Sequence, residues 1–174
     1  DLNHEYSAIE NEMKAVAYIL GDRVLRACSA QAVLDQMGNL RGKVSDRAIL
    51  RALHFFAEDQ RVVEQVRALE DNDFPRFLDL IIESGYSSWM YCQNVFAPNA
   101  VQKQELAIAL AASQGYLEGR GAWRVHGGGF AGTIQAFIPQ SILPGYIEMM
   151  ENIFGAGACH LLQVRPDGGV RMWD

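Results

Sequence analysis

The spacing of apolar residues changes near residue 120, and this change limits the possible fold more than any other feature of the sequence. Before it, apolar residues recur every three or four positions, as on one face of a helix. After it, they alternate in short runs bounded by glycines, as in strands. The helical part covers about residues 5–114 and the sheet part about residues 120–174. The order of elements predicts an α+β fold with a ferredoxin-like antiparallel sheet covered by helices.

Local signals divide these two parts into elements. Candidate capping residues are Ser29, Ser45 and Asp73, and the pair Gly38-Asn39 is expected to form a turn. Helices are predicted at 5–20, 29–37, 45–69, from Asp73 onward, at 101–113 and at 144–154, and strands at 122–126, 133–138, 159–165 and 170–173. The sheet part therefore has the order strand–strand–helix–strand–strand.

Composition excludes several classes of protein. The chain has 174 residues, 49% of them hydrophobic, and a net charge of −6. One domain with a buried core is therefore feasible, and a general nucleic-acid or anionic-membrane surface is disfavoured. No apolar stretch approaches the roughly twenty residues of a membrane helix. The three cysteines form no Cys-x-x-Cys pair, so we expect reduced thiols, a cytoplasmic location and no metal held by this chain. Because the chain begins with Asp1 and not methionine, we expect either a trimmed start or a piece of a longer protein.

A glycine cluster at residues 127–132 is the strongest candidate for a binding site. Four glycines in six positions allow successive backbone N–H groups to face one anion, most often a phosphate. The candidate residues are Gly127, Gly128, Gly129, Phe130 and Gly132. The same composition is also typical of a wide turn between two strands, and both interpretations stay open. The cluster is not a dinucleotide-binding fingerprint, because the glycine spacing differs and a strand follows in place of a helix. It is not a Walker loop, because no Gly-Lys-Ser/Thr follows it.

The strand that enters the cluster adds two candidates. Side chains alternate along a strand, so Trp123 and Val125 are expected in the core while Arg124 and His126 share the other face. There a guanidinium and an imidazole could contact phosphate oxygens. A structural ion pair is an equal alternative for Arg124. His126 is disfavoured as a general base because no carboxylate nearby in the sequence orients it.

Other charged and titratable residues have plainer interpretations. His54, between Leu53 and Phe55 in a helix, is expected to be a packed, hydrogen-bonded histidine. Arg61, Glu64 and Arg67 are expected to form a solvated helix face.

Residues 121–133 resemble the third conserved motif of galactokinases, which belong to the GHMP kinase superfamily. Four further segments resemble that family in the same order, so the likeness covers nearly the whole chain. They are Glu5-Tyr6 with Glu12, residues 51–54 with Glu58 and Arg61, Glu83-Ser84 with Ser87, and residues 155–159.

The resemblance implies that residues 1–174 are the C-terminal domain of a galactokinase-like enzyme whose N-terminal catalytic domain is absent from this chain. Such an enzyme uses ATP and Mg²⁺ to phosphorylate the anomeric hydroxyl of a sugar such as galactose. The glycine cluster would lie behind the ATP phosphates, and Tyr6 would contact the sugar, with simple packing as the alternative for Tyr6. The implied partners are the N-terminal kinase domain and the sugar. No catalytic residue is expected here, and the isolated chain is expected to be inactive.

Five positions depart from the family pattern. His126 replaces a serine or threonine, Ala131 replaces a glycine, Gly85 replaces a histidine, and Ile9-Glu10 replaces a pair of arginines. A divergent branch that acts on another sugar would accommodate these changes, and so would a member that has lost turnover. The function hypotheses are therefore a sugar-1-kinase domain, a non-catalytic module that senses sugar and nucleotide, and a domain whose glycine turn is only structural.

Overall fold

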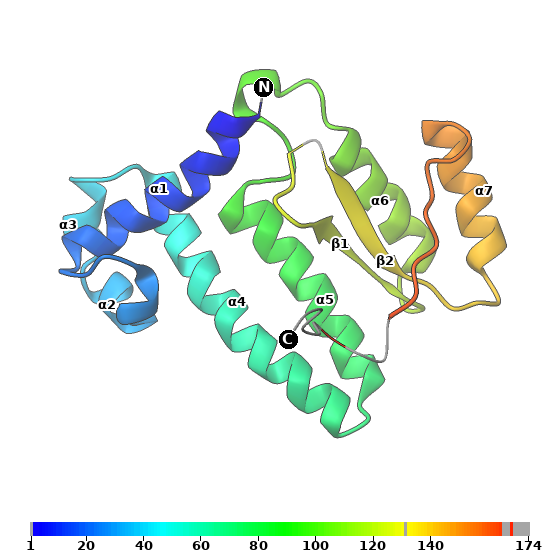
Figure 1. Ribbon diagram of the computed structural model, residues 1–174, viewed down its shortest axis with the longest axis horizontal. Helices are drawn as coiled ribbons and strands as arrows, with labels where there is room; N and C mark the ends of the chain where they lie inside the picture. The colour runs from blue at the N-terminus through cyan, green and yellow to red at the C-terminus, as the bar shows by residue number, and fades with distance from the viewer. Residues whose placement is uncertain (1, 131, 165–167, 169–174) are drawn as a thin grey trace, which may run out of the picture. The chain divides into compact units, whose positions relative to one another are not determined.

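The computed structural model describes residues 2–130, 132–164 and 168, and it divides into two units, Asp1–Pro139 and Gln140–Asp174 (Figure 1). Among these described residues, the first unit contains a set of helices and one β-hairpin, and the second contains one helix. The elements of the first unit are α1 (Asn3–Ile19), a 3₁₀ turn (Leu25–Ala27), α2 (Ala30–Asp35), α3 (Met37–Arg41), α4 (Asp46–Glu70), α5 (Phe74–Ser87), a π-helical turn (Ser88–Cys92), a 3₁₀ turn (Pro98–Ala100), α6 (Glu105–Leu117), β1 (Ala122–His126) and β2 (Thr133–Phe137), and the second unit has α7 (Leu143–Phe154). The α+β class and the helical N-terminal part are confirmed.

Three helices begin where the capping residues predict. The hydroxyl of Ser29 accepts a hydrogen bond from the amide of Ala32, and that of Ser45 accepts one from the amide of Ala48, each at 3.1 Å. The carboxylate of Asp73 accepts one from the amide of Arg76, also at 3.1 Å. Each cap satisfies an amide that has no partner inside its helix, and this explains why the boundaries could be read from sequence.

The helical core lies where α1, α2 and α3 pack against α4, and α5 lies beside α4 (Figure 1). Val16 and Ala17 of α1 are fully buried there with Leu40 of α3 and Ala52 of α4. The burial of Leu40 gives a physical reason for α3, which forms where the pair Gly38-Asn39 predicted a turn. That prediction was wrong because core packing overrides weak local preferences.

The hairpin is antiparallel, with a register that runs from Ala122 opposite Phe137 to His126 opposite Thr133. Both α5 and α6 pack against β1. A Cβ on Gly85 of α5 would lie 3.1 Å from the carbonyl oxygen of Trp123. The absence of a side chain at Gly85 therefore permits the close approach of α5 and β1.

The C-terminal strands and helix α6 differ from the sequence prediction or lie outside the described residues. Residues 159–164, expected to begin a third strand, form no ladder with any described residue; a strand requires such a partner for its backbone groups. The fourth predicted strand, 170–173, lies outside the described residues. Helix α6 starts and ends four residues later than predicted, and its last residue, Leu117, is fully buried.

Candidate functional site

The glycine cluster forms the loop between β1 and β2, and its backbone is left-handed at three positions. The φ angles are +61° at Gly127, +80° at Gly129 and +59° at Phe130. Gly127 and Gly128 are exposed, whereas Gly129 and Phe130 are buried. A phenylalanine at positive φ is uncommon, so surrounding contacts must hold the loop in this conformation.

Asn94, which follows the π-helical turn, binds the loop at two points. Its carbonyl oxygen accepts a hydrogen bond of 2.6 Å from the amide of Phe130. Its side-chain Nδ2 donates to the carbonyl oxygen of Gly128 at 3.2 Å. A Cβ on Gly129 would overlap the carbonyl oxygen of Asn94, so only glycine fits there.

Tyr6, at the start of α1, binds the loop from another direction. Its hydroxyl donates to the carbonyl oxygen of Gly129 at 3.1 Å. Its ring meets the ring of Phe130 edge-on, with centroids 5.3 Å apart. A Cβ on Gly128 would lie 2.5 Å from Cε1 of Tyr6. The predicted sugar contact and the predicted phosphate loop are therefore neighbours.

The loop amides fall into two groups. Those of Phe130 and Gly132 are already bonded, to Asn94 and to the carbonyl oxygen of Gly129 respectively. The amides of Gly127, Gly128 and Gly129 donate to no residue within the described ranges. Of the five residues named from sequence, the first three thus have N–H groups without a described partner, and of these Gly127 and Gly128 are exposed whereas Gly129 is buried. Ala131 lies outside the described residues.

Arg124 and His126, two residues apart on β1, contact different groups. Nε of Arg124 donates to the carbonyl oxygen of Val125 at 3.0 Å, and its Nη1 lies 4.0 Å from Glu58 of α4. Burial lowers the pKa of Arg124, and the charge of Glu58 opposes this shift. This placement favours the structural ion pair for Arg124. His126 is exposed, with Nδ1 3.4 Å from the hydroxyl of Thr133.

Glu58 is the centre of a polar cluster between α4, α5 and β1. It accepts hydrogen bonds from Ser84, at 2.5 Å, and from Arg61. The Arg61 side chain is only 13% exposed and lies 3.7 Å from Glu83, so its assignment to a solvated face was wrong. Arg61 contacts residues of α5, which a pattern within one helix cannot reveal, whereas Arg67 is exposed as predicted.

His54 confirms its interpretation as a packed histidine. Its Nδ1 lies 2.9 Å from the hydroxyl of Ser87. Burial lowers the pKa of His54; Arg61 and Arg124 lower it further, and Glu58 opposes them.

A second charged cluster joins α1 to α4. Arg51 is fully buried; its Nη1 donates to Glu12 at 2.9 Å and its Nε to the carbonyl oxygen of Cys92 at 2.9 Å. Arg47 also binds Glu12, at 2.5 Å. Burial lowers the pKa of Arg51, and the carboxylate of Glu12 opposes this. The contact with Cys92 was missed because no local pattern reports it.

Comparison with known proteins shows which proteins this chain resembles. No protein-family profile matches the chain. It is 28% identical to a galactokinase of Actinobacillus pleuropneumoniae serotype 5b over 86% of this chain and 36% of that protein. The human galactokinase is 27% identical over 94% of this chain and 39% of that protein, and the Haemophilus influenzae galactokinase is 30% identical over 78% and 33%. The crystal structure of Lactococcus lactis galactokinase complexed with galactose superposes with a TM-score of 0.62 and 19% identity, over 87% of this chain and 38% of that one. The chain is galactokinase-like.

The galactokinase-like chain matches the C-terminal part of these proteins and spans between a third and two-fifths of their length. The superposition shows that this chain shares the fold of the matched part of Lactococcus lactis galactokinase. Within the described ranges, no group of three or more His, Cys, Asp or Glu side chains could hold a metal, and no helix is long and apolar enough to cross a membrane.

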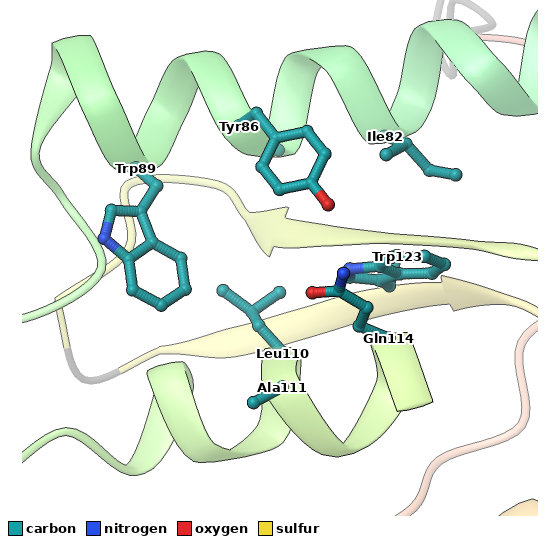
Figure 2. A pocket seen from close by; sticks show the side chains of 8 residues that line it. Ile82, Tyr86, Trp89, Leu110, Ala111, Gln114 and Trp123 are labelled. Atoms are coloured by element: carbon teal, nitrogen blue, oxygen red, sulfur yellow. The ribbon is translucent and has the colours of Figure 1, made fainter. Parts of the chain in front are cut away.

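An apolar pocket of about 90 Å³ lies between α5 and α6 of the galactokinase-like chain. Figure 2 shows Tyr86 and Trp89 on one side, Leu110 and Gln114 on the other, and Trp123 from β1. Trp123 is buried, as its place in the strand predicted. The pocket carries no charged side chain, so it offers little that could bind a phosphate.

Proposed function

We propose that this chain is the C-terminal part of an ATP-dependent sugar-1-kinase of the galactokinase type, and that its glycine loop lies behind the ATP phosphates. The observation that supports this best is that the amides of Gly127, Gly128 and Gly129 donate to no described residue, and that Gly127 and Gly128 are exposed. Successive N–H groups in such a turn form a concave site for anionic oxygens, and hydrogen bonds to a charged acceptor are stronger than neutral ones.

Tyr6 is proposed to contact the sugar. Its hydroxyl donates to Gly129, and a phenolic oxygen that donates one hydrogen bond can still accept another. The side chain is 41% exposed, so a sugar hydroxyl could reach that oxygen.

Phosphoryl transfer depends on positioning and on neutralisation of phosphate charge, and Mg²⁺ bound with ATP supplies much of that neutralisation. The free amides suit phosphate oxygens, whereas the described residues offer no cluster of metal ligands. In this proposal the metal, the catalytic base and most of the sugar pocket belong to an N-terminal kinase domain, which is the partner of this chain.

Replacement of Gly128 tests the proposed role of the loop. In the full-length protein we expect Gly128→Val to weaken ATP binding, because the new side chain would displace Tyr6 and distort the loop. Gly38→Val in α3 is the control, since a Cβ there meets no described atom within 4 Å. Unchanged affinity for ATP in Gly128→Val would mean that the glycine turn is only structural.

An assay of the isolated chain tests whether the catalytic groups lie outside residues 1–174. We expect no turnover when residues 1–174 alone are assayed with ATP, Mg²⁺ and galactose by coupled ADP release. Enzyme-like turnover would contradict the proposal that the catalytic groups lie outside this chain.

The alternative is a non-catalytic module that binds sugar and nucleotide. The contact of Arg124 with Glu58 is compatible with it, because this guanidinium lies 4.0 Å from a carboxylate of the same chain. ATP binding without any ADP release in the full-length protein would support this alternative, and sequence upstream of this chain that contains a phosphate loop and an acidic base would favour the kinase.

A further inference from the structure

The glycine loop is held by a residue that is far from it in the sequence. Asn94 contacts the loop through both its backbone and its side chain, at Phe130 and at Gly128. Gly128 is one of the three residues whose amides have no described partner, and Phe130 directly follows them in the chain. The orientation of those amides therefore depends on where Asn94 is placed.

The position of Asn94 is in turn determined by its neighbours. Gln93, the residue before it, is left-handed with φ 55° and ψ 48°, and its amide donates to the carbonyl oxygen of Ser88 across the π-helical turn. The carbonyl oxygen of Cys92 accepts from Arg51, which also binds Glu12 of α1. Because Tyr6 of the same helix binds Gly129, α1 reaches the loop both directly and through Arg51.

The side chain of Asn94 is poorly explained by stability alone. It is 4% exposed, and its Oδ1 has no hydrogen-bond partner among the described residues. A buried acceptor without a partner destabilises the folded state. The benefit of its Nδ2 bond to Gly128 is offset by that cost, so the net gain in stability is small.

We propose that Asn94 is a positioning residue for the glycine loop, which orients the amides of Gly127, Gly128 and Gly129 toward the nucleotide phosphates. This inference rests on the proposed function. Asn94 itself need not touch the nucleotide, because its contacts are with the loop backbone.

The test uses Asn94→Ala and Asn94→Leu in the full-length protein. Alanine removes the side-chain bond to Gly128, and leucine removes it while keeping the number and branching of the side-chain heavy atoms. Gln93→Asn is the matched control, since asparagine tolerates the left-handed conformation and Asn94 keeps its contacts. If the expected activity is present, KM for ATP rises about three- to tenfold in both Asn94 variants, which corresponds to one lost hydrogen bond. KM for galactose and the melting temperature stay near those of the wild type.

Hydrogen exchange at the amide of Phe130 provides a readout that does not depend on activity. We expect it to accelerate about three- to tenfold in the Asn94 variants, because the loop opens more often. A lower melting temperature with unchanged KM for ATP and unchanged exchange would overturn the inference. A wild-type protein that binds no ATP would instead overturn the proposed function, and exchange at Phe130 would then still decide whether Asn94 orders the loop.

Discussion

The hydroxyl of Tyr6 donates a hydrogen bond to the carbonyl oxygen of Gly129, a residue 123 positions further along the chain. The bond connects the first helix to the loop between the two strands. It also orders a carbonyl group next to the free amides of the loop. A movement of Tyr6 with α1 would therefore change the position of the Gly129 carbonyl group in the candidate phosphate loop.

Removal of that hydroxyl should destabilise the protein moderately. Tyr6→Phe keeps the ring against Phe130 and Gly128 but loses the bond to Gly129. We expect a loss of about 1 kcal/mol in the free energy of unfolding, measured by urea denaturation. Tyr18→Phe is the control, because that side chain is 81% exposed. Equal effects of the two substitutions would show that the bond to Gly129 contributes nothing.

Gly128 and Tyr6 should be energetically coupled. A Cβ on Gly128 meets the Tyr6 ring, so Gly128→Ala should destabilise the wild type by about 1–3 kcal/mol, as overpacking does. In a Tyr6→Ala background the same substitution should cost less, because the clashing ring is gone. A double-mutant cycle with urea denaturation measures this difference. Additive effects would mean that the loop moves away from Tyr6 without cost.

Some features of the fold followed from local sequence. The bounds of β1 agree with prediction because its residues alternate and glycines stand at both ends. The caps at Ser29, Ser45 and Asp73 act within their own helices, so a few neighbouring residues suffice to specify them.

Other features could not be predicted because they depend on contacts between distant segments. Arg61 looks like a surface residue until α5 covers it, and Arg51 has no sequence neighbour that indicates its bond to Cys92. The candidate site shows the same division. Its glycines were recognisable, but the contacts of Asn94 with the loop and of Arg124 with Glu58 required the tertiary structure.

Arg51 should matter more for stability than Arg47, although both bind Glu12. Arg51→Met leaves the carbonyl oxygen of Cys92 without its donor in a buried place, whereas Arg47 is 29% exposed at its side chain. We expect Arg51→Met to cost about 3–5 kcal/mol, as the breaking of buried pairs does. Arg47→Met should cost about 1 kcal/mol or less, in the range of exposed pairs. Urea denaturation of both variants provides the comparison, and equal losses would contradict the role assigned to Cys92.

Stability should decrease as the pH falls through the range of histidine. The pKa of His54 is lowered from its ordinary value of 6.5 because burial disfavours the charged ring, with Arg61 and Arg124 acting in the same direction. The unfolded chain therefore binds more protons, and the contribution of His54 is complete above about pH 6.5 and is lost as the pH falls toward the folded pKa. His54→Gln should flatten the dependence of unfolding free energy on pH between 7.5 and about 5.5. An unchanged slope in this variant would assign the effect to another group.

Cys92 should be the least reactive of the thiols in the folded protein. It is buried, and burial raises its pKa to about 11, with the charge of Arg51 opposing that shift. Because the thiolate is the reactive form, a disulfide reagent at neutral pH should modify Cys28, which is half-buried, well before Cys92. Mass spectrometry of the modified peptides, before and after unfolding in urea, separates the two sites. Rapid modification of Cys92 in the folded protein would mean that the segment after α5 opens readily, and Asn94 would then be too mobile to order the glycine loop.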